Sequence, residues 1–354
     1  MTAHLADFVR AARVPDDGPS VEQEIFGTHE PGTVAAWYSR LCTQVLGSPI
    51  AAPLFYVSSS GCVAGVELAD GRQLSVKAHQ RRSSLDLLQL IDDAQRRLAS
   101  AGFACPMPEI APVRFEQVFV TVEQLLFDPG MRVLAPEEMS ASAAALAEAA
   151  GILREVDPTP WAGLHTFHAA PGALYPEPHS PLFDFTLQRD DEEVVRVDEL
   201  AAAAIAARDR GDAPLALFHC DWSARNIRLR DGRLIASYDW DSLDACRESA
   251  AVGNAAATWR STGEPDDPPA PGPDEIDAYL DAYLEAAGPD EHRRRCGRSL
   301  RAWRVAAMGE ALWLLAYTAR CEHAIEARFS DERPRRARDT LVRHRTAFLA
   351  ALEA

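Results

Sequence analysis

The feature that most constrains the fold is a series of short extended segments, which is concentrated in the first third of the chain. Alternating or apolar runs at residues 54–57, 62–68 and 73–78 are separated by a serine-rich turn at 58–61 and an Asp-Gly turn at 70–71. An Asp-Gly pair between two such runs is a strong signal for a tight β-hairpin. The pattern therefore predicts a three-stranded antiparallel meander.

Helical patterns precede this meander and dominate the chain after residue 130. Residues 1–50 are predicted to be helical, and a helix at 84–100 leads to two more strands at 110–115 and 118–123. We then expect helices at 137–156, 192–208, 274–287, 290–326 and 333–353, with a strand at 215–218 and an Asp-Gly hairpin at 227–238. This order predicts an α+β fold with a sheet-rich lobe at 1–125, a larger helical lobe at 126–354, and a ligand site between them.

Composition excludes several functional classes. The chain of 354 residues has a formal net charge of −17, which argues against binding to nucleic acid. No segment approaches 18 uninterrupted apolar residues, and the start, MTAHLADFVRAAR, lacks the apolar centre of a signal peptide, so we expect no membrane partner. Seven cysteines without a Cys-x-x-Cys pair favour reduced thiols and a cytoplasmic location.

Polar side chains gather around one predicted hairpin within residues 218–241, FHCDWSARNIRLRDGRLIASYDWD. Counting outward from its Asp-Gly turn places Asn226 opposite Ser237, two residues from Asp239. An amide oxygen and a carboxylate at that separation suit a shared Mg²⁺ ion, which takes few protein ligands. The alternative is that these residues serve only as turn and cap residues.

Asp221 lies five residues before Asn226, where it is a candidate to accept a proton from an incoming hydroxyl. The pattern His219-x-Asp221-x4-Asn226, followed by Asp239, resembles the motifs of the aminoglycoside phosphotransferase and choline-kinase-like family, within the protein-kinase-like fold. The resemblance covers about residues 50 to 325. It implies a bilobal fold in which Asp221 is catalytic, His219 supports the catalytic loop, and Asn226 and Asp239 hold Mg²⁺.

A lobe of this kind requires a lysine on its third strand to hold the α- and β-phosphates of ATP. The third predicted strand carries Lys77, which is the only lysine in a chain with 35 arginines. Leu74, Val76 and Ala78 share one face of that strand and Lys77 lies on the other. Because an ammonium and a guanidinium are not interchangeable at a phosphate site, Lys77 is predicted to contact ATP.

The predicted phosphate loop departs from the Gly-x-Gly-x-x-Gly pattern of protein kinases. Its residues are Ser59, Ser60 and Gly61, following Ser58. Serine-rich turns can donate backbone N–H and hydroxyl groups to phosphate, so we expect these residues to bind ATP. The alternative is a plain hairpin turn.

Two further parts of the first lobe follow from the resemblance. The strand that ends near residue 126 resembles the segment entering the interlobe hinge, where backbone groups near Glu123 and Leu125 would bind the adenine edge. The helix after Lys77 should offer a glutamate to pair with it, but it offers only Asp92 and Asp93 near the expected place. An altered ion pair is therefore expected at Lys77.

The acceptor site is predicted from acidic residues after the hairpin and on a late helix. Asp241, Asp244 and Glu310 are candidates to line a pocket for a cationic substrate. The alternative is that carboxylates occur everywhere on a chain with so negative a charge. His165 and His168 are interpreted as loop or packing residues, because no further ligands accompany them.

The resemblance thus implies a kinase that uses ATP and Mg²⁺. Its reaction would transfer the γ-phosphate to a hydroxyl of an aminoglycoside-like compound or another amino- or hydroxyl-bearing metabolite, and the protein would be a monomer or homodimer. The alternative from another class is a pseudokinase, a nucleotide-binding or scaffold protein without turnover. The absence of a helix glutamate motivates this alternative, and the complete set of Lys77, Asp221, Asn226 and Asp239 argues against it.

Overall fold

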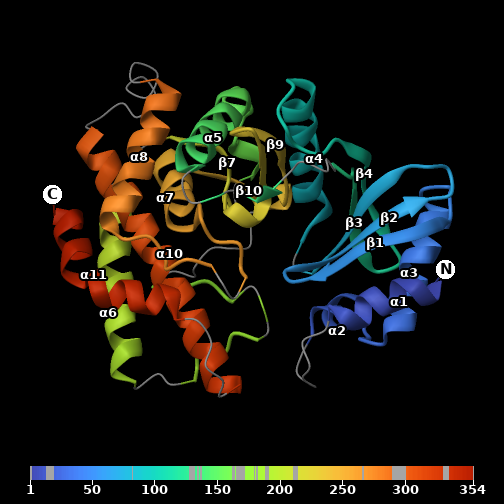
Figure 1. The fold of residues 1–354 in the computed structure, drawn as a ribbon, viewed down its shortest axis with the longest axis horizontal. Coiled ribbons are helices and arrows are strands. Elements are labelled where there is room, and N and C mark those ends of the chain that lie inside the picture. Colours follow the sequence, from blue (N-terminus) through green and yellow to red (C-terminus); the bar gives the residue numbers. More distant parts are fainter. Residues whose placement is uncertain are drawn as a thin grey trace.

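Figure 1 shows the computed structural model of the chain. It describes residues 2–12, 20–81, 83–126, 132–133, 135, 138–161, 164, 172–178, 180, 182–187, 191–209, 214–264, 267–288, 300–329 and 335–353. His165, His168 and Cys296 lie outside these ranges.

A five-stranded antiparallel sheet forms the smaller lobe, as the sequence predicts. In the order in which they lie side by side, its strands are β1 (Ile50–Ser58), β2 (Gly61–Leu68), β3 (Gln73–His79), β5 (Val118–Gln124) and β4 (Pro108–Phe115). β1 begins earlier than predicted because Ile50 pairs with Leu68 at the far end of β2. β3 is the central strand, with β2 on one side and β5 on the other.

Three helices cover one face of this sheet: α1 (Thr2–Ala11), α2 (Val21–Phe26) and α3 (Pro31–Gln44). Their apolar side chains share a buried core with Val76, Ala78 and Val120 of the sheet. Because side chains alternate along a strand, this packing turns Lys77 to the opposite face.

Helix α4 (Leu85–Ser100) follows β3 but packs into the larger lobe. The Ser84 hydroxyl caps its first turn by accepting a hydrogen bond from the Leu87 N–H. Its apolar residues Leu88, Ile91 and Leu98 belong to the core of the larger lobe, and Figure 1 shows the helix standing between the sheet and α5. α4 therefore contacts β4 of the sheet, while its apolar residues are buried in the core of the larger lobe and not in the core behind the sheet.

Helices make up most of the larger lobe. They are α5 (Met139–Leu153), α6 (Glu192–Arg208), α7 (Glu248–Thr258), α8 (Pro273–Ala287), α10 (Leu300–Phe329) and α11 (Arg336–Glu353), with a short 3₁₀ helix η2 (Thr159–Trp161). The predicted helix 290–326 is described from Leu300 and continues to Phe329. Within the part of the chain that the structure describes, none of the helices combines the length and hydrophobicity needed to cross a membrane.

Two small sheets carry the motif residues of the larger lobe. Their strands are β6 (Arg132–Val133), β8 (Ile227–Arg230) and β9 (Arg233–Ser237) in one sheet, and β7 (Leu215–His219) and β10 (Leu243–Arg247) in the other. The 3₁₀ helices η3 (Ala224–Asn226) and η4 (Trp240–Ser242) flank the hairpin.

The predicted register of this hairpin is wrong by one residue. Ile227, not Asn226, lies opposite Ser237, because the ladder is irregular between Arg228 and Leu229. The Tyr238 N–H instead donates to the Asn226 carbonyl at 2.8 Å. Asn226 therefore lies one residue closer to Asp239 than counting from the turn predicted.

Candidate active site

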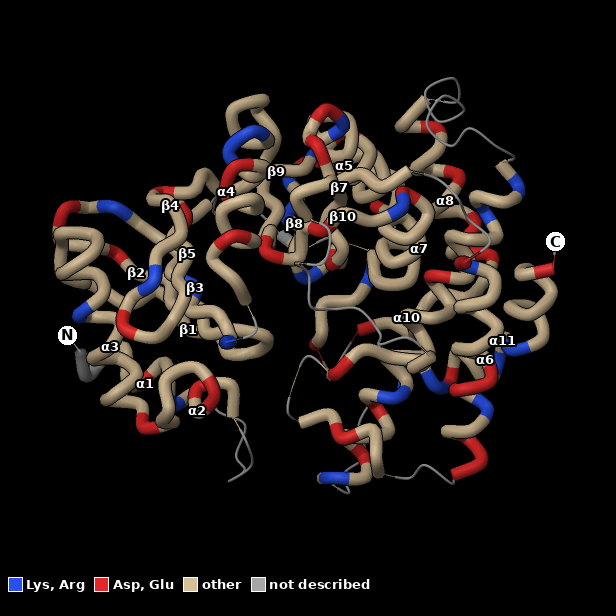
Figure 2. The backbone as a smooth tube through the Cα atoms, turned by 180° about the vertical axis from the view of Figure 1, so that it is seen from behind, with Lys and Arg blue, Asp and Glu red and all other residues tan. Residues whose placement is uncertain are grey.

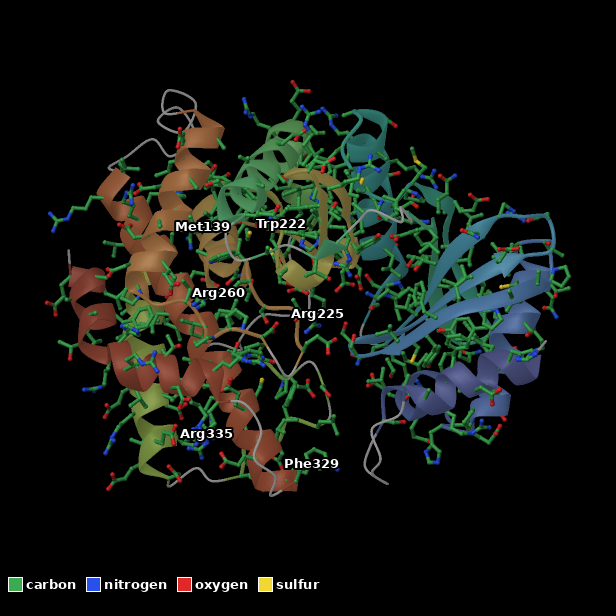
Figure 3. The ribbon with its side chains drawn as sticks, viewed as in Figure 1. Met139, Trp222, Arg225, Arg260, Phe329 and Arg335 are labelled. Carbon is green, nitrogen blue, oxygen red and sulfur yellow. The ribbon has the colours of Figure 1, made fainter. Side chains whose placement is uncertain are left out.

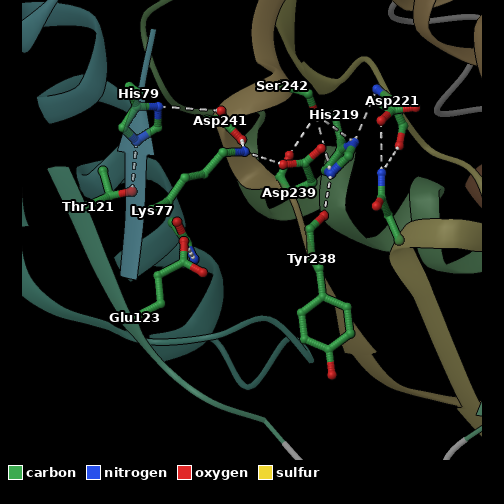
Figure 4. A network of polar contacts seen from close by, with 12 residues as sticks. Lys77, His79, Thr121, Glu123, His219, Asp221, Tyr238, Asp239, Asp241 and Ser242 are labelled. Atoms are coloured by element: carbon green, nitrogen blue, oxygen red, sulfur yellow. Dashed lines mark hydrogen bonds and ion pairs between the residues drawn. The ribbon is translucent and has the colours of Figure 1, made fainter. Parts of the chain in front are cut away.

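Lys77 lies at the junction of the two lobes and contacts two carboxylates of the larger lobe (Figure 4). Its Nζ is 2.5 Å from Asp239 Oδ1 and 2.6 Å from Asp241 Oδ1, and its side chain is 14% exposed. Burial opposes the charged form, but the two carboxylates outweigh it and hold the pKa of Lys77 above its usual value. The only lysine of the chain is thus a charged group shared between the lobes.

Asp239 owes its position to an abrupt change of direction after β9. Its backbone is left-handed, with φ 64° and ψ 43°, a conformation that aspartate tolerates better than most residues. Ser242 fixes this bend, since its N–H and hydroxyl both donate to the Asp239 carbonyl, at 3.1 and 2.8 Å. The bend directs both Asp239 and Asp241 toward Lys77, and burial raises the pKa of Asp239.

His219 holds the loop that carries Asp221 from inside, through two hydrogen bonds. Its Nε2 donates to the Tyr238 carbonyl at 2.9 Å, and its Nδ1 accepts from the Asp221 N–H at 3.2 Å. Its ring packs between Trp222 and Trp240, with centroids 5.3 and 4.9 Å away. Burial lowers the pKa of His219 to about 4, so the ring is neutral at pH 7 and serves as a structural hydrogen-bonding group.

Trp222 anchors the same loop to the helices. Its indole N–H donates to the Ser142 carbonyl of α5 at 3.0 Å, and its side chain is fully buried. Figure 3 shows it deep in the larger lobe, among the helices. The residue directly after Asp221 therefore fixes the loop against the helical core.

Asp221 and Asn226 are joined by two hydrogen bonds. Asn226 Nδ2 donates to the Asp221 carbonyl at 2.8 Å and to Asp221 Oδ2 at 3.0 Å. Burial, and next the negative charge of Asp239, raise the pKa of Asp221 to about 6. A carboxylate with this pKa is ionised at pH 7 but is a stronger base than a solvated aspartate.

The donor set around Asn226 fits Mg²⁺. Since its amide nitrogen is directed at Asp221, the amide oxygen is the ligating atom that Asn226 can offer beside the Asp239 carboxylate. Hard oxygen donors of this kind, few in number, are what Mg²⁺ prefers when phosphates and waters complete its shell. Among the described residues, no group of three or more His, Cys, Asp or Glu side chains is placed to hold a metal ion.

Gly61, the residue that follows the serine turn, lies close to Lys77. The Ser59 N–H donates to the Gly61 carbonyl at 3.0 Å, which makes Ser59-Ser60 a tight connection between β1 and β2. A Cβ atom added to Gly61 would meet Lys77 Cε at 3.2 Å and the Ala78 carbonyl oxygen at 3.1 Å. Glycine therefore permits the turn to approach the lysine closely.

Glu123 and Leu125, the two residues predicted to bind adenine through their backbone, form other hydrogen bonds in the structure. The Leu125 N–H donates to the Gln73 carbonyl at 2.9 Å, so an adenine would have to use other backbone groups of this segment. The Glu123 side chain lies on the Lys77 face of the sheet and accepts a hydrogen bond from Gln95 Nε2 at 2.9 Å. Desolvation raises the pKa of Glu123 to about 7. Its side chain, and not only its backbone, belongs to the site.

The three candidate acceptor-site acids do not form one group. Asp241 contacts Lys77 and faces His79 on the sheet side of the site. Asp244 is buried in β10, where it accepts a hydrogen bond from the Ala245 N–H at 2.7 Å. Glu310 is buried in α10 with Arg208 Nη1 3.6 Å away, and burial raises its pKa to about 7. Asp241 therefore lies with Lys77 and His79, apart from Asp244 and Glu310.

Acidic residues are not confined to the site. Figure 2 shows acidic positions along the backbone of both lobes, as expected for a net charge of −17. The number of carboxylates near Asp244 and Glu310 is therefore no argument by itself for a cation pocket.

Three polar residues that no motif singled out line the Lys77 side of the site: His79, Thr121 and Gln95. His79 Nε2 is 2.9 Å from the Thr121 hydroxyl, and Gln95 Nε2 also donates to the Pro106 carbonyl at 2.9 Å. His79 follows Lys77 by two residues on the same strand, so alternation alone places both on one face. Gln95 and Thr121 carry no such local signal.

The acids of α4 do not contact Lys77. Asp92 pairs with Arg96 on its own helix, with Oδ2 2.7 Å from Nε, and Asp93 is exposed. Helix α4 thus reaches the site through the Gln95 amide rather than through a carboxylate.

No protein-family model and no curated protein sequence matches the chain. Solved structures resemble it nonetheless. The amicoumacin kinase hAmiN, in complex with AMP-PNP, Ca²⁺ and Ami, is similar with a TM-score of 0.54 at 13% identity, over 84% of this chain and 88% of that one. A microcompartment-associated aminopropanol kinase gives 0.52 at 13% identity, over 85% and 91% of the two chains.

A third similar structure is a putative fructosamine-3-kinase from Thermobifida fusca. Its TM-score is 0.50 at 18% identity, over 89% of this chain and 98% of that one. The chain therefore has the bilobal, protein-kinase-like fold of small-molecule kinases, as predicted. Identities this low establish the fold, and the chemistry has to be argued from the site.

Proposed function

We propose that the chain is an ATP- and Mg²⁺-dependent kinase that phosphorylates a hydroxyl group of a small molecule. One observation carries this proposal. Asp221, hydrogen-bonded to Asn226, and Lys77, paired with Asp239, meet at the junction of the lobes, although 162 positions separate Lys77 from Asp239 in the chain. An arrangement of these four residue types is what phosphoryl transfer requires.

The proposed roles follow from the chemistry of each group. Asp221 orients the acceptor hydroxyl and takes its proton as the acceptor oxygen bonds to the γ-phosphorus and the bond to the leaving ADP oxygen breaks. Lys77 neutralises phosphate charge, and Ser59, Ser60 and Gly61 cover the phosphates. Asn226 and Asp239 would hold Mg²⁺, which supplies charge compensation on the β- and γ-phosphates when bound.

The adenine is proposed to lie beside the end of β5. The Leu125 N–H is occupied by Gln73, so the proposed contacts use other backbone groups between Glu123 and Leu126. We place the division between the lobes at residues 125–126. This is supported by the end of β5 at Gln124 and by the hydrogen bond from the Tyr238 hydroxyl to the Leu126 carbonyl, 2.8 Å long.

An amino- or hydroxyl-bearing acceptor is the proposed substrate class. Two of the similar structures are named for an aminopropanol and a fructosamine, which supports an amine in the acceptor. Asp244 and Glu310 remain candidate contacts for that amine, because both are buried acids of the larger lobe and Asp244 lies opposite Phe218, three residues before Asp221. The enzyme would act in the cytoplasm as a monomer or homodimer.

The competing proposal is a pseudokinase that binds nucleotide without turnover. The observation in its favour is that the Lys77 ammonium is already paired with two carboxylates. ATP consumption over a panel of amino sugars, amino alcohols and other hydroxylated metabolites, with Asp221→Ala as control, separates the two. Turnover above the Asp221→Ala background supports the kinase. ATP binding with no turnover above that background for any acceptor supports the pseudokinase.

Antibiotic resistance is tested separately. Expression of the wild type and of Asp221→Ala in a sensitive bacterium either raises tolerance to an aminoglycoside in the wild type alone or does not. Equal tolerance in both strains would remove aminoglycosides from the proposed acceptors.

A further inference from the structure

The Lys77 partner that protein kinases supply from a helix is not supplied by α4 in this chain. The helix contains no glutamate, Asp92 is paired with Arg96, and Gln95 is the α4 side chain that contacts the site, through Glu123. Yet Lys77 has two carboxylate partners, both from the segment after β9.

The two carboxylates differ in how many groups hold them. Asp239 Oδ1 contacts Lys77 from a left-handed bend. Asp241 is approached from two positions on β3, with Oδ1 2.6 Å from Lys77 Nζ and Oδ2 3.6 Å from His79 Nδ1. Alternation along the strand places Lys77 and His79 side by side on one face, so that each faces one oxygen of the same carboxylate.

His79 is itself held in place. It is 4% exposed, and its Nε2 lies 2.9 Å from the Thr121 hydroxyl on β5. If Nε2 accepts the Thr121 proton, Nδ1 carries the ring proton and directs it at Asp241, which is the arrangement that a carboxylate favours. Thr121, His79 and Lys77 thus form a frame on the sheet that receives Asp241 from the other lobe, as Figure 4 shows.

We infer that Asp241 is the positioning residue of Lys77, taking the place of a helix glutamate. This rests on the proposed function only in so far as Lys77 acts on ATP phosphates. Asp239 is then left for the metal, because Lys77 keeps a carboxylate partner when Asp239 turns away from it. Without Asp241, the ammonium and the metal compete for one carboxylate.

Nucleotide binding tests this assignment. The equilibrium dissociation constants of ATP, ADP and adenosine are measured for the wild type, Asp241→Asn, Asp241→Ala and Lys77→Met. We expect Asp241→Asn and Asp241→Ala to weaken ATP about tenfold and adenosine less than twofold, because Lys77 acts on phosphates. The Lys77→Met, Asp241→Asn double variant should bind ATP no more weakly than Lys77→Met alone, since both changes remove one interaction.

The matched control is a carboxylate on α4. Asp92→Asn and Asp93→Asn should leave all three dissociation constants unchanged, since neither residue contacts Lys77. Wild-type ATP affinity in both Asp241 variants would overturn the assignment, and so would an equal loss for ATP and adenosine.

A second measurement needs no nucleotide. Because Lys77 is the only lysine, acetylation of the folded protein by acetic anhydride, read by mass spectrometry of the peptide around residue 77, reports one side-chain amine. Acetylation should be several-fold faster in Asp241→Asn than in the wild type and unchanged in Asp92→Asn. Equal rates in all three would overturn the inference. A wild type that binds no ATP refutes the proposed kinase, whereas this measurement still decides the pairing.

Discussion

The two halves of the site are built in different ways. One half is built around His219, Asp221 and Asn226 and carries the proposed catalytic residues. This catalytic half is held by hydrogen bonds within one short stretch of chain and by the packing of His219 between Trp222 and Trp240. The Lys77 half is held by ion pairs between residues 162 and 164 positions apart. The contacts of the first half lie within the larger lobe, whereas those of the second half join the two lobes.

This difference has an energetic meaning. A buried, neutral hydrogen-bonded frame such as that of His219 has no charge to satisfy, whereas an ammonium between two carboxylates depends on partners that another ligand can attract. The catalytic half should therefore tolerate nucleotide binding unchanged, and the Lys77 half should rearrange.

The largest effect is expected at the catalytic half. Asp221→Asn should lower kcat by about 10³-fold, because the variant cannot accept the acceptor proton. ATP affinity should change little, since the Asn226 amide can still donate to the Asp221 backbone carbonyl. Steady-state kinetics with ATP binding measured in parallel checks this. Asp231→Asn in the exposed turn of the same hairpin is the control, and a comparable loss there would show that the hairpin, not the carboxylate, is being probed.

The second largest effect is expected at the Lys77 half. Lys77→Arg should lower kcat/KM for ATP about 10²-fold. A guanidinium does not fit under Gly61 between two carboxylates, and a misplaced positive charge slows phosphoryl transfer by orders of magnitude. Thermal unfolding should remain within a few degrees of wild type. The reverse exchange, Arg81→Lys at an exposed position of the same lobe, should be silent. Near-normal activity of Lys77→Arg would remove Lys77 from the phosphate site.

A smaller effect concerns pH. Burial, and next Asp239, raise the pKa of Asp221 to about 6, and the proposed base must be ionised. kcat/KM for the acceptor should therefore rise about tenfold between pH 5 and pH 7, with a midpoint near 6, and then level off. A profile flat through this range would contradict Asp221 as the base. The weak residual activity of Asp221→Asn should lack this midpoint.

Gly61→Ala should weaken ATP binding about fivefold. The new methyl group would press on Lys77 Cε and on the Ala78 carbonyl, so the lysine must shift by a few tenths of an ångström, and phosphate contacts are sensitive to such shifts. The control is Gly151→Ala in α5, where an added Cβ has open space and helix propensity improves. If both variants bind ATP equally well, the close approach of the serine turn has no role in binding.

The smallest effect is expected far from Lys77. Burial raises the pKa of Glu310 to about 7. Between the ordinary pKa of a glutamate and about 7, the folded state therefore keeps a proton on Glu310 that the unfolded state has lost. That contribution to stability is complete at low pH and is lost as pH rises through about 7. The Tm of Glu310→Gln relative to wild type should therefore increase by about 2 °C from pH 5 to pH 8. Exposed Glu285→Gln should show no such trend.

Much of the fold could be predicted because its signals are local. The Asp-Gly turns and the alternation of 73–78 predict a sheet with Lys77 facing away from the apolar core, and the structure has both. Counting from the turn predicts a hairpin register that differs by one residue from the observed one. The count assumes a regular ladder, and the ladder is irregular between Arg228 and Leu229. The sequence does not predict strand β10, because this strand depends on pairing with β7, more than twenty residues earlier in the chain.

The site shows the same limit. Asp221 and Asn226 lie in one motif, and the structure brings them together. Asp241 was expected at the acceptor, because nothing in the local sequence tells which lobe the bend at Asp239 faces. The side-chain contact of Glu123 with Gln95 depends on how α4 packs against the larger lobe, a tertiary arrangement without a local pattern.

The single lysine also defines a single point of cleavage. A protease that cuts only after lysine has one target in this sequence, the bond between Lys77 and Ala78. That bond lies in β3, where Lys77 is paired with Val63 on one side and Thr121 on the other. Digestion therefore requires the central strand to leave the sheet, and its rate measures the opening of the smaller lobe, apart from any unfolding confined to the helices.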